Sequence, residues 1–180
     1  MVDRVLVDAS ALQSAVESMA HEIVDELGTD FDMVGVASGG VAVAQLLLSV
    51  LRESHECEPR FGVIDITLYR DDLYTGLECP ALGVTDIPFQ IDSRPIVLID
   101  DVIFTGRTIR AALQELGDLG RPKMVRLAVL LDRGHRELPI QPDYCGVKIQ
   151  TRRTDRIDVE MDGVQKATVI LRPISTREES

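Results

Sequence analysis

Two patterns of apolar residues alternate along the chain. Near the N-terminus, apolar residues recur every three or four positions, which predicts an amphipathic helix. They are Leu12, Val16, Met19, Ile23 and Leu27. Continuous apolar runs elsewhere predict buried strands, at residues 33–37, 61–69, 95–99 and 124–131. Two further helices are predicted at residues 41–52 and 109–116. This alternation indicates an α/β fold with a central, mainly parallel sheet flanked by helices.

Local signals predict where these elements begin and end. Ser10 followed by Gln13 forms a capping-box pattern at the start of the first helix, and Gly28 predicts its end. Residues 70–88 form a long irregular stretch with glycines and prolines, as is typical of a functional loop. The tail has short strand-like pieces, at residues 147–150, 157–161 and 168–171, with Asp162-Gly163 as a hairpin signal. We therefore expect the last quarter of the chain to form a small β-rich attachment.

The composition fits a single globular domain. The 180 residues suffice for one core, and 45% of them are hydrophobic. The 19 Lys and Arg against 30 Asp and Glu give a net charge of −11, which argues against non-specific binding to DNA or to an anionic membrane. The three cysteines form no C-x-x-C pair, and the first residues lack a signal-peptide pattern. A reduced, cytoplasmic protein is therefore expected.

The segment that says most about chemistry is IVLIDDVIFTGRT, residues 96–108. A predicted buried strand ends in Asp100 and Asp101, and a loop containing Thr105, Gly106 and Thr108 leads into a helix. Ligands of open α/β sheets bind beyond the carboxyl ends of the strands. A glycine-containing loop at a helix N-terminus suits a phosphate, and paired carboxylates suit sugar hydroxyls or Mg²⁺. The segment therefore predicts a site for a phosphorylated sugar.

Each of these features has a simpler explanation when taken alone. The two aspartates are then only a strand end, and Thr108 is only the N-cap of the helix. Their occurrence together and in this order favours the binding site. The sequence contains neither G-x-x-x-x-G-K-[ST] nor G-x-G-x-x-G, so neither a Walker-type nor a dinucleotide site is indicated.

Residues 96–108 resemble the phosphoribosyl diphosphate (PRPP) signature of type I phosphoribosyltransferases. Two further stretches, IDITLYRDDL (64–73) and LAVLLDRGHRELPI (127–140), are similar to a bifunctional family of pyrimidine-operon attenuators and uracil phosphoribosyltransferases. The resemblance covers nearly the whole chain. It implies a type I phosphoribosyltransferase fold in one domain, residues 1–180, with a core at about 30–131. A small β-rich hood would come from the N-terminal segment and about 132–180.

The resemblance also implies an activity and its partners. The reaction is uracil plus PRPP giving UMP and diphosphate, with Mg²⁺ as cofactor. UMP and UTP are the expected nucleotide ligands, and a homodimer or higher homo-oligomer is the expected assembly. Phe104 stands where some purine-using relatives carry an acid, which favours a pyrimidine base. Gly39 stands in the region where the family usually has an arginine in its diphosphate loop.

Roles for individual residues follow from the same resemblance. The expected catalytic residues are Asp100 and Asp101, which hold the ribose hydroxyls and Mg²⁺ bound through PRPP, and Arg70, a charge partner for diphosphate. The expected PRPP- and phosphate-binding residues are Ser38, Gly39, Gly40, Val102, Phe104, Thr105, Gly106, Arg107 and Thr108. The expected uracil-binding residues are Leu131, Arg133, Gly134 and Arg136.

The family's second activity is UMP-dependent binding of the pyr mRNA leader, which needs a basic surface. Residues 1–35 hold one base and eight acids, whereas residues 121–156 hold nine bases and four acids. The expected RNA contacts are His21, Arg136, Lys148 and Arg152, although His21 alone is typical of a helix-surface histidine. Alternatives stay open: an enzyme that has lost regulation, mainly an RNA-binding regulator that senses nucleotides, or a phosphoribosyltransferase for another base such as orotate or a purine.

Overall fold

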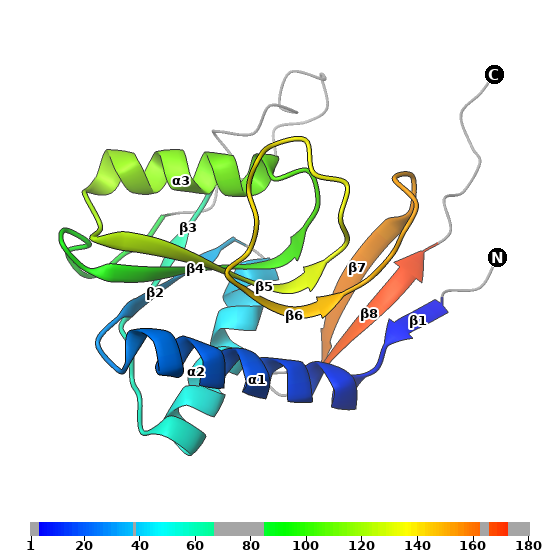
Figure 1. The fold of residues 1–180 in the computed structure, drawn as a ribbon, viewed down its shortest axis with the longest axis horizontal. Helices are drawn as coiled ribbons and strands as arrows, with labels where there is room; N and C mark the ends of the chain where they lie inside the picture. The colour runs from blue at the N-terminus through cyan, green and yellow to red at the C-terminus, as the bar shows by residue number, and fades with distance from the viewer. Residues whose placement is uncertain (1–3, 38, 67–84, 163–165, 173–180) are drawn as a thin grey trace.

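The computed structural model describes residues 4–37, 39–66, 85–162 and 166–172 (Figure 1). Its helices are α1 (Ala9–Leu27), α2 (Gly39–His55) and α3 (Arg107–Leu119). Its strands are β1 (Arg4–Val7), β2 (Asp32–Val36), β3 (Phe61–Ile64), β4 (Pro95–Ile103), β5 (Met124–Asp132), β6 (Tyr144–Lys148), β7 (Arg156–Asp162) and β8 (Lys166–Arg172).

The larger sheet has the strand order β3-β2-β4-β5-β6, and every neighbouring pair in it is parallel. Helices α1 and α2 pack on one face, where Val97 and Ile99 of β4 join their apolar residues in one core. Helix α3 packs on the other face, against Leu98 of β4. The predicted α/β fold with a central, mainly parallel sheet is therefore confirmed. Because all five strands run the same way, their carboxyl ends meet at one edge.

The smaller sheet is antiparallel, with the order β1-β8-β7 (Figure 1). It joins the N-terminal segment to the C-terminal hairpin and contacts the main body through Val169, which is fully buried in the core beneath α1. The residues between β7 and β8, including Gly163 of the predicted turn, lie outside the described residues.

Strand β6 departs from the expectation. The sequence placed a strand at residues 147–150 in the β-rich attachment, but β6 pairs in parallel with β5 and completes the main sheet. Close packing on β5 and α1 explains why Gly146 lies there, since a Cβ at this position would lie 2.7 Å from the Leu130 carbonyl oxygen and 3.0 Å from the Met19 sulfur. A glycine in a five-residue strand weakens the strand pattern, so the start of β6 escapes detection from sequence.

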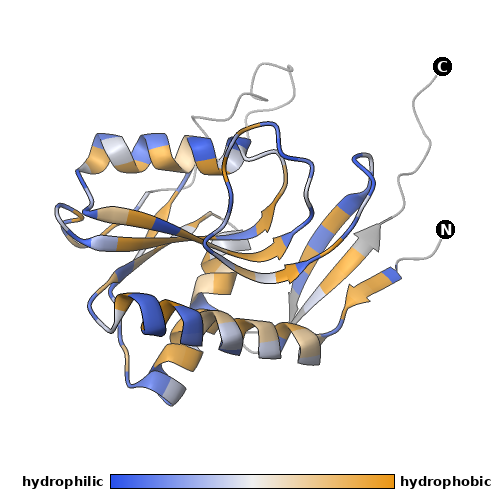
Figure 2. Cartoon of the chain, in the orientation of Figure 1, coloured by the Kyte–Doolittle hydropathy of each residue, from blue (hydrophilic) through white to orange (hydrophobic). Residues whose placement is uncertain are grey.

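Helix boundaries differ in smaller ways. Asp8, not Ser10, caps α1, because its carboxylate accepts the Ala11 N–H at 2.9 Å from an extended backbone position. Ser10 already lies inside the helix. The apolar residues gather in the strands and on the inner sides of the helices (Figure 2). Within the described ranges, no helix has the length and hydropathy needed to cross a membrane.

Candidate active site at the carboxyl edge of the main sheet

Both aspartates of the signature lie inside β4 rather than beyond its end. The strand was predicted to stop at residue 99, but it continues to Ile103, and Val102 and Ile103 still pair with β5. Successive side chains of a strand point to opposite faces. Asp101 therefore shares a face with Ile99, on the α2 side, whereas Asp100 shares the face of Leu98, on the α3 side. The two carboxyl groups therefore lie in different surroundings on opposite faces of the sheet.

Asp100 is a buried carboxyl group. Only 4% of the residue is exposed, and its Oδ1 accepts the Asp101 N–H at 3.0 Å. Burial raises the pKa of Asp100 well above its ordinary value, and the neighbouring charge of Asp101 raises this pKa further. Both effects favour the uncharged form of Asp100. In this structure Asp100 thus holds the backbone of Asp101 in place through this hydrogen bond.

Asp101 is the accessible member of the pair, and it lies against the start of α2. Its Oδ1 accepts the Val102 N–H at 2.8 Å, and its carboxylate occupies the space that a side chain on Gly39 would fill. Gly40 packs against the Ile99 carbonyl oxygen in the same way. Ser38, the remaining residue of the expected diphosphate loop, lies outside the described residues, as does Arg70. The structure thus brings Asp101, Gly39 and Gly40 together.

The loop between β4 and α3 has the form of an anion-binding turn. Gly106 caps α3 with φ +93°, a left-handed conformation that favours glycine, so the alternative of Thr108 as N-cap is wrong. No described residue accepts the N–H of Thr105, Gly106 or Thr108, whereas the Arg107 N–H is 3.4 Å from the Thr105 hydroxyl. Free N–H groups at the start of a helix are a ready phosphate site.

The opposite side of this loop is held by the β5–β6 connection. The Phe104 carbonyl accepts Arg136 Nη1 at 2.9 Å, and the Thr105 carbonyl accepts the N–H groups of Glu137 and Leu138 at 3.0 and 3.1 Å. In a trans peptide the N–H points away from the C=O. Anchoring the carbonyls therefore leaves the N–H groups on the other side for a ligand.

Arg133 joins the signature loop to residues 151–155. It is 7% exposed, and its guanidinium donates to the Arg152 and Asp155 carbonyls at 2.9 and 2.8 Å. The same guanidinium lies over the Phe104 ring, 4.4 Å from the centroid. Burial lowers the pKa of Arg133 from its ordinary value. Of the expected uracil-binding residues, Arg133 is thus tied to its neighbours in the protein.

The other three expected uracil-binding residues take different positions. Leu131 is fully buried in the core, so its side chain supports the strand. Gly134 has φ +73°, and its N–H donates to Asp132 Oδ1 at 2.9 Å. The Arg136 guanidinium lies 2.7 Å from the Asp132 carboxylate, with 12% of its side chain exposed. The signature loop is thus contacted by the side chains of Arg133 and Arg136 and by the backbone N–H groups of Glu137 and Leu138, and not by the side chain of Leu131.

Two residues in this region were not singled out from sequence. Glu137 pairs with both Arg107, at 3.0 Å, and Arg153, so it links the signature loop to the 151–155 segment. His135 packs edge-on against Phe104 at 5.7 Å, and its Nε2 lies 2.7 Å from the Thr151 carbonyl oxygen. Both residues belong to the stretch 127–140 that carried the resemblance, and that stretch was the only sequence signal for them.

The basic segment 121–156 does not form one continuous surface. Arg126 pairs with Glu26 of α1 at 2.5 Å, and Arg133 and Arg136 are held inside as described above. Arg121 and Lys123 are exposed at the start of β5, whereas Lys148, Arg152 and Arg153 are exposed near its other end. A nine-residue strand spans about 26 Å, so the two groups are well separated. His21 is exposed on α1 and lies 3.4 Å from Asp25.

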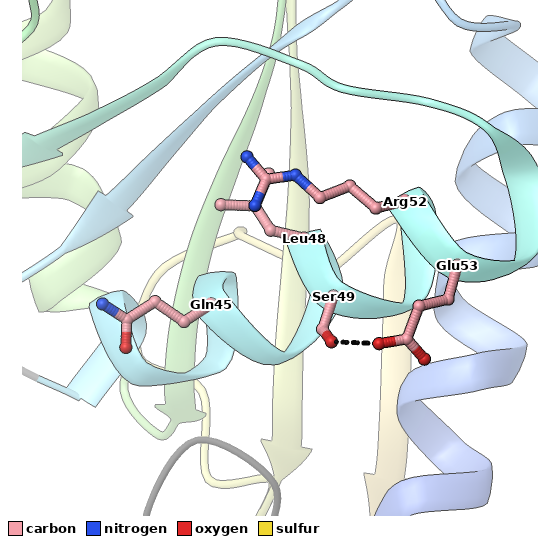
Figure 3. Close-up of a pocket in the computed structure, with 5 residues that line it drawn as sticks. All are labelled: Gln45, Leu48, Ser49, Arg52 and Glu53. Carbon is pink, nitrogen blue, oxygen red and sulfur yellow. Dashed lines mark hydrogen bonds between the residues drawn. The ribbon is translucent and has the colours of Figure 1, made fainter.

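A hollow on α2 is separate from these groups. Among the described residues it is lined by Gln45, Leu48, Ser49, Arg52 and Glu53, and the Ser49 hydroxyl donates to Glu53 at 2.9 Å (Figure 3). None of the expected site residues lines it. The residues expected from sequence to carry the chemistry therefore lie outside this hollow.

Comparison with known proteins agrees with this geometry. A family model described as a phosphoribosyl transferase domain matches residues 6–163. "Bifunctional protein PyrR" of Acetivibrio thermocellus is 45% identical over 175 residues, covering 94% of this chain and 95% of the relative. The protein of the same name from Roseiflexus sp. is 43% identical and covers 98% of this chain and 99% of the relative.

Solved structures show the same fold at low identity. The hypoxanthine phosphoribosyltransferase of Trypanosoma cruzi is 18% identical with a TM-score of 0.71, covering 94% of this chain and 97% of that one. A hypoxanthine phosphoribosyltransferase from Staphylococcus aureus is 18% identical with a TM-score of 0.66, covering 82% and 77%. The chain belongs to the phosphoribosyltransferase family, in the group of the bifunctional PyrR proteins.

Proposed function

We propose that this protein is a uracil phosphoribosyltransferase, which converts uracil and PRPP into UMP and diphosphate, and that it also regulates pyrimidine genes. One observation carries the enzymatic part. At the carboxyl edge of a parallel sheet, the Asp101 carboxylate lies between the N-terminus of α2 and a turn whose N–H groups are free for a phosphate. From α2 through Asp101 to the turn, this arrangement suits the diphosphate, ribose and 5′-phosphate of PRPP, which follow one another in that order.

The proposed roles follow from that order. The turn 105–108 binds the 5′-phosphate through N–H groups and the positive end of α3. Asp101 holds the ribose hydroxyls, and the start of α2, with Gly39 and Gly40, receives the diphosphate. Negative charge builds on the leaving diphosphate while the ribose becomes positively charged. The protein therefore accelerates the reaction mainly by positioning the substrates and stabilising that charge.

Mg²⁺ fits this site only together with substrate. Within the described residues, no group of three or more acidic, histidine or cysteine side chains is arranged to hold a metal ion. Mg²⁺ prefers six oxygen ligands and often combines one or two carboxylates with substrate phosphates. In the proposal Asp101 supplies a carboxylate oxygen and PRPP supplies the others. The bound metal would neutralise charge on the leaving diphosphate.

Base choice is the first point to test. Phe104 offers no acid to a purine ring, and Arg133 and His135 fix its ring in place. Purified protein with PRPP and Mg²⁺ should form a nucleotide from uracil at least 100-fold more efficiently, in kcat/KM, than from hypoxanthine, guanine or orotate. A higher kcat/KM with any of the other three bases would contradict the proposal.

Regulation is proposed through RNA binding at one end of β5. Lys148, Arg152 and Arg153 are exposed bases at this end of β5. β6 ends beside Asp132, Arg152 is bonded to Arg133 through its carbonyl, and the Arg153 guanidinium lies 5.8 Å from the centroid of the Phe104 ring. The first helix offers mainly carboxylates. UMP bound in the signature loop is thus linked through Arg133 to the backbone of this basic group.

RNA binding can be tested with a charge reversal and its matched control. Gel shifts with the organism's own pyrimidine leader RNA should show binding that UMP strengthens and salt weakens. The double variant Lys148→Glu/Arg152→Glu should bind at least tenfold more weakly. Arg121→Glu/Lys123→Glu, at the other end of β5, should bind like the wild type. An equal loss in both double variants would mean that RNA binding depends only on net charge. If the wild type does not bind the RNA, the regulatory part of the proposal is wrong and only the enzymatic part remains.

A further inference from the structure

Glu115 is a buried carboxyl group to which the proposed reaction gives no role. It lies in α3, and only 8% of the residue is exposed. Its Oε1 accepts the hydroxyl of Thr85, whereas no described group bonds to its Oε2. A buried polar atom without a partner costs free energy, so a carboxyl group at this place calls for an explanation.

Thr85 connects Glu115 to the end of β3. The Thr85 hydroxyl oxygen accepts the Asp65 N–H at 3.0 Å, while its hydrogen is donated to Glu115. The next residue, Asp86, forms an antiparallel bridge with Val63 of β3, with N···O distances of 2.8 and 2.9 Å. β3 is an edge strand of the main sheet. This piece of chain is thus held against the sheet edge by its backbone and against α3 by Glu115.

The residues that Thr85 joins flank a stretch that the proposed reaction needs. Residues 67–84 lie outside the described residues and contain Arg70, the expected charge partner of diphosphate. The bond between Asp65 and Thr85 holds the two flanks of this stretch together, and Glu115 joins them to α3. Helix α3 begins at the turn proposed for the 5′-phosphate. The flanks are therefore anchored on the same helix that carries the phosphate site.

We propose that Glu115 is a positioning residue for PRPP binding, since through Thr85 it holds both flanks of residues 67–84 on α3. This role rests on the proposed function, because it takes Arg70 as the partner of the diphosphate. PRPP, which carries the diphosphate, therefore depends on this anchor. UMP carries only the 5′-phosphate and does not depend on it.

The uncharged form of Glu115 suits this role. Burial raises the pKa of Glu115, although the hydrogen bond from Thr85 opposes this shift. The charges of Asp65, which follows β3, and of Asp118 in α3 raise the pKa further. A glutamine at this position keeps an oxygen for the Thr85 hydroxyl and cannot ionise, so Glu115→Gln should retain the anchor. A leucine is similar in size but has no acceptor, so Glu115→Leu should lose it.

Ligand binding by matched variants tests the anchor. In Glu115→Leu the dissociation constant of PRPP, measured by calorimetry, should rise about fivefold, because Arg70 is no longer held in place, and that of UMP should change less than about twofold. Thr85→Val, which removes the hydroxyl, should show the same pattern. Glu115→Gln should bind both ligands like the wild type. Gln114→Leu, at an exposed position of the same helix, is the control and should also bind both normally.

Three results would overturn the proposal. They are unchanged PRPP affinity in Glu115→Leu, equal losses of PRPP and UMP affinity, and a loss in Glu115→Gln as large as in Glu115→Leu. The double variant Glu115→Leu/Thr85→Val should lose no more than either single variant, because both remove the same bond, and additive losses would also contradict the proposal. Wild-type protein that binds PRPP but does not use uracil would defeat the proposed base and leave this anchor standing.

The pH dependence of stability tests the link without any ligand. A carboxyl group whose pKa is raised by folding stabilises the protein fully below the pKa of the unfolded chain, about 4.3. It loses that contribution as the pH rises through the folded value. The free energy of unfolding of the wild type, relative to that of Glu115→Gln, should therefore fall from about pH 4.5 to about pH 7.5 in urea titrations. A difference that stays constant over this range would overturn the proposal, since Glu115 would then not be held as a buried, uncharged group.

Discussion

Asp101→Asn should lower kcat/KM for UMP formation by about 100-fold or more, the size expected when a group that stabilises charge in the transition state is lost. The amide keeps the shape of the carboxylate and can still accept the Val102 N–H, so the fold should be retained. It loses the negative charge that lies against the N-terminus of α2 and that, in the proposed function, holds the ribose hydroxyls. Steady-state assays with uracil and PRPP measure the effect.

The neighbouring aspartate provides the sharpest comparison. Asp100 is buried, and burial favours its uncharged form, so Asp100→Asn keeps an oxygen for the Asp101 N–H and should cost at least tenfold less than Asp101→Asn. Asp25→Asn, on the exposed side of α1, controls for a general loss of acid. Unchanged turnover of Asp101→Asn at saturating uracil and PRPP would remove Asp101 from the catalytic residues.

The signature 96–108 could be recognised from sequence, but the division of labour within it could not. The apolar run stops at Ile99, so a pattern of hydrophobic residues places the strand end there. The actual end depends on β5, whose Leu131 and Asp132 continue to pair with Val102 and Ile103. Only the longer strand puts Asp100 and Asp101 on opposite faces. The pairing of residues 102 and 103 with β5 cannot be predicted from the local pattern of hydrophobic residues in β4.

The links around the signature loop are equally hidden in the sequence. Arg107 begins α3, whereas Glu137 and Arg153 come from two separate connections, and the fold alone brings the three together. Read along the chain, these charges are typical of a solvated surface. The count of nine bases in residues 121–156 also overstates the basic surface available to RNA, because Arg133 contacts carbonyls and an aromatic ring inside the protein. Exposure, which the count does not contain, decides how many of these bases are available to RNA.

The largest effect on stability should come from Asp32, at the opposite edge of the sheet. Asp32 is 1% exposed at the start of β2, and Arg60 donates to both of its oxygens at 2.8 and 2.7 Å. Arg94 adds a third bond at 2.9 Å, so one carboxylate joins the chain before β3 and before β4 to β2. Removing this carboxylate takes away three charge-assisted hydrogen bonds, each worth about 1.5–3 kcal/mol, although the two arginines left behind are partly exposed and regain water. Asp32→Ala should therefore lower the free energy of unfolding by about 2–4 kcal/mol in urea titrations.

The pH dependence of stability identifies the charge as the cause. Burial of Asp32 opposes ionisation, but hydrogen bonds from Arg60 and Arg94 outweigh it and hold the pKa of Asp32 below its ordinary value. A group with a lowered pKa in the folded state stabilises the protein above the pKa of the unfolded chain, about 3.9, and loses that contribution as the pH falls through the folded value. The stability difference between wild type and Asp32→Asn should thus be constant from pH 7 to 5 and shrink below about pH 4. A difference that stays constant down to pH 2 would mean that packing, and not the ionised carboxylate, holds these three segments together.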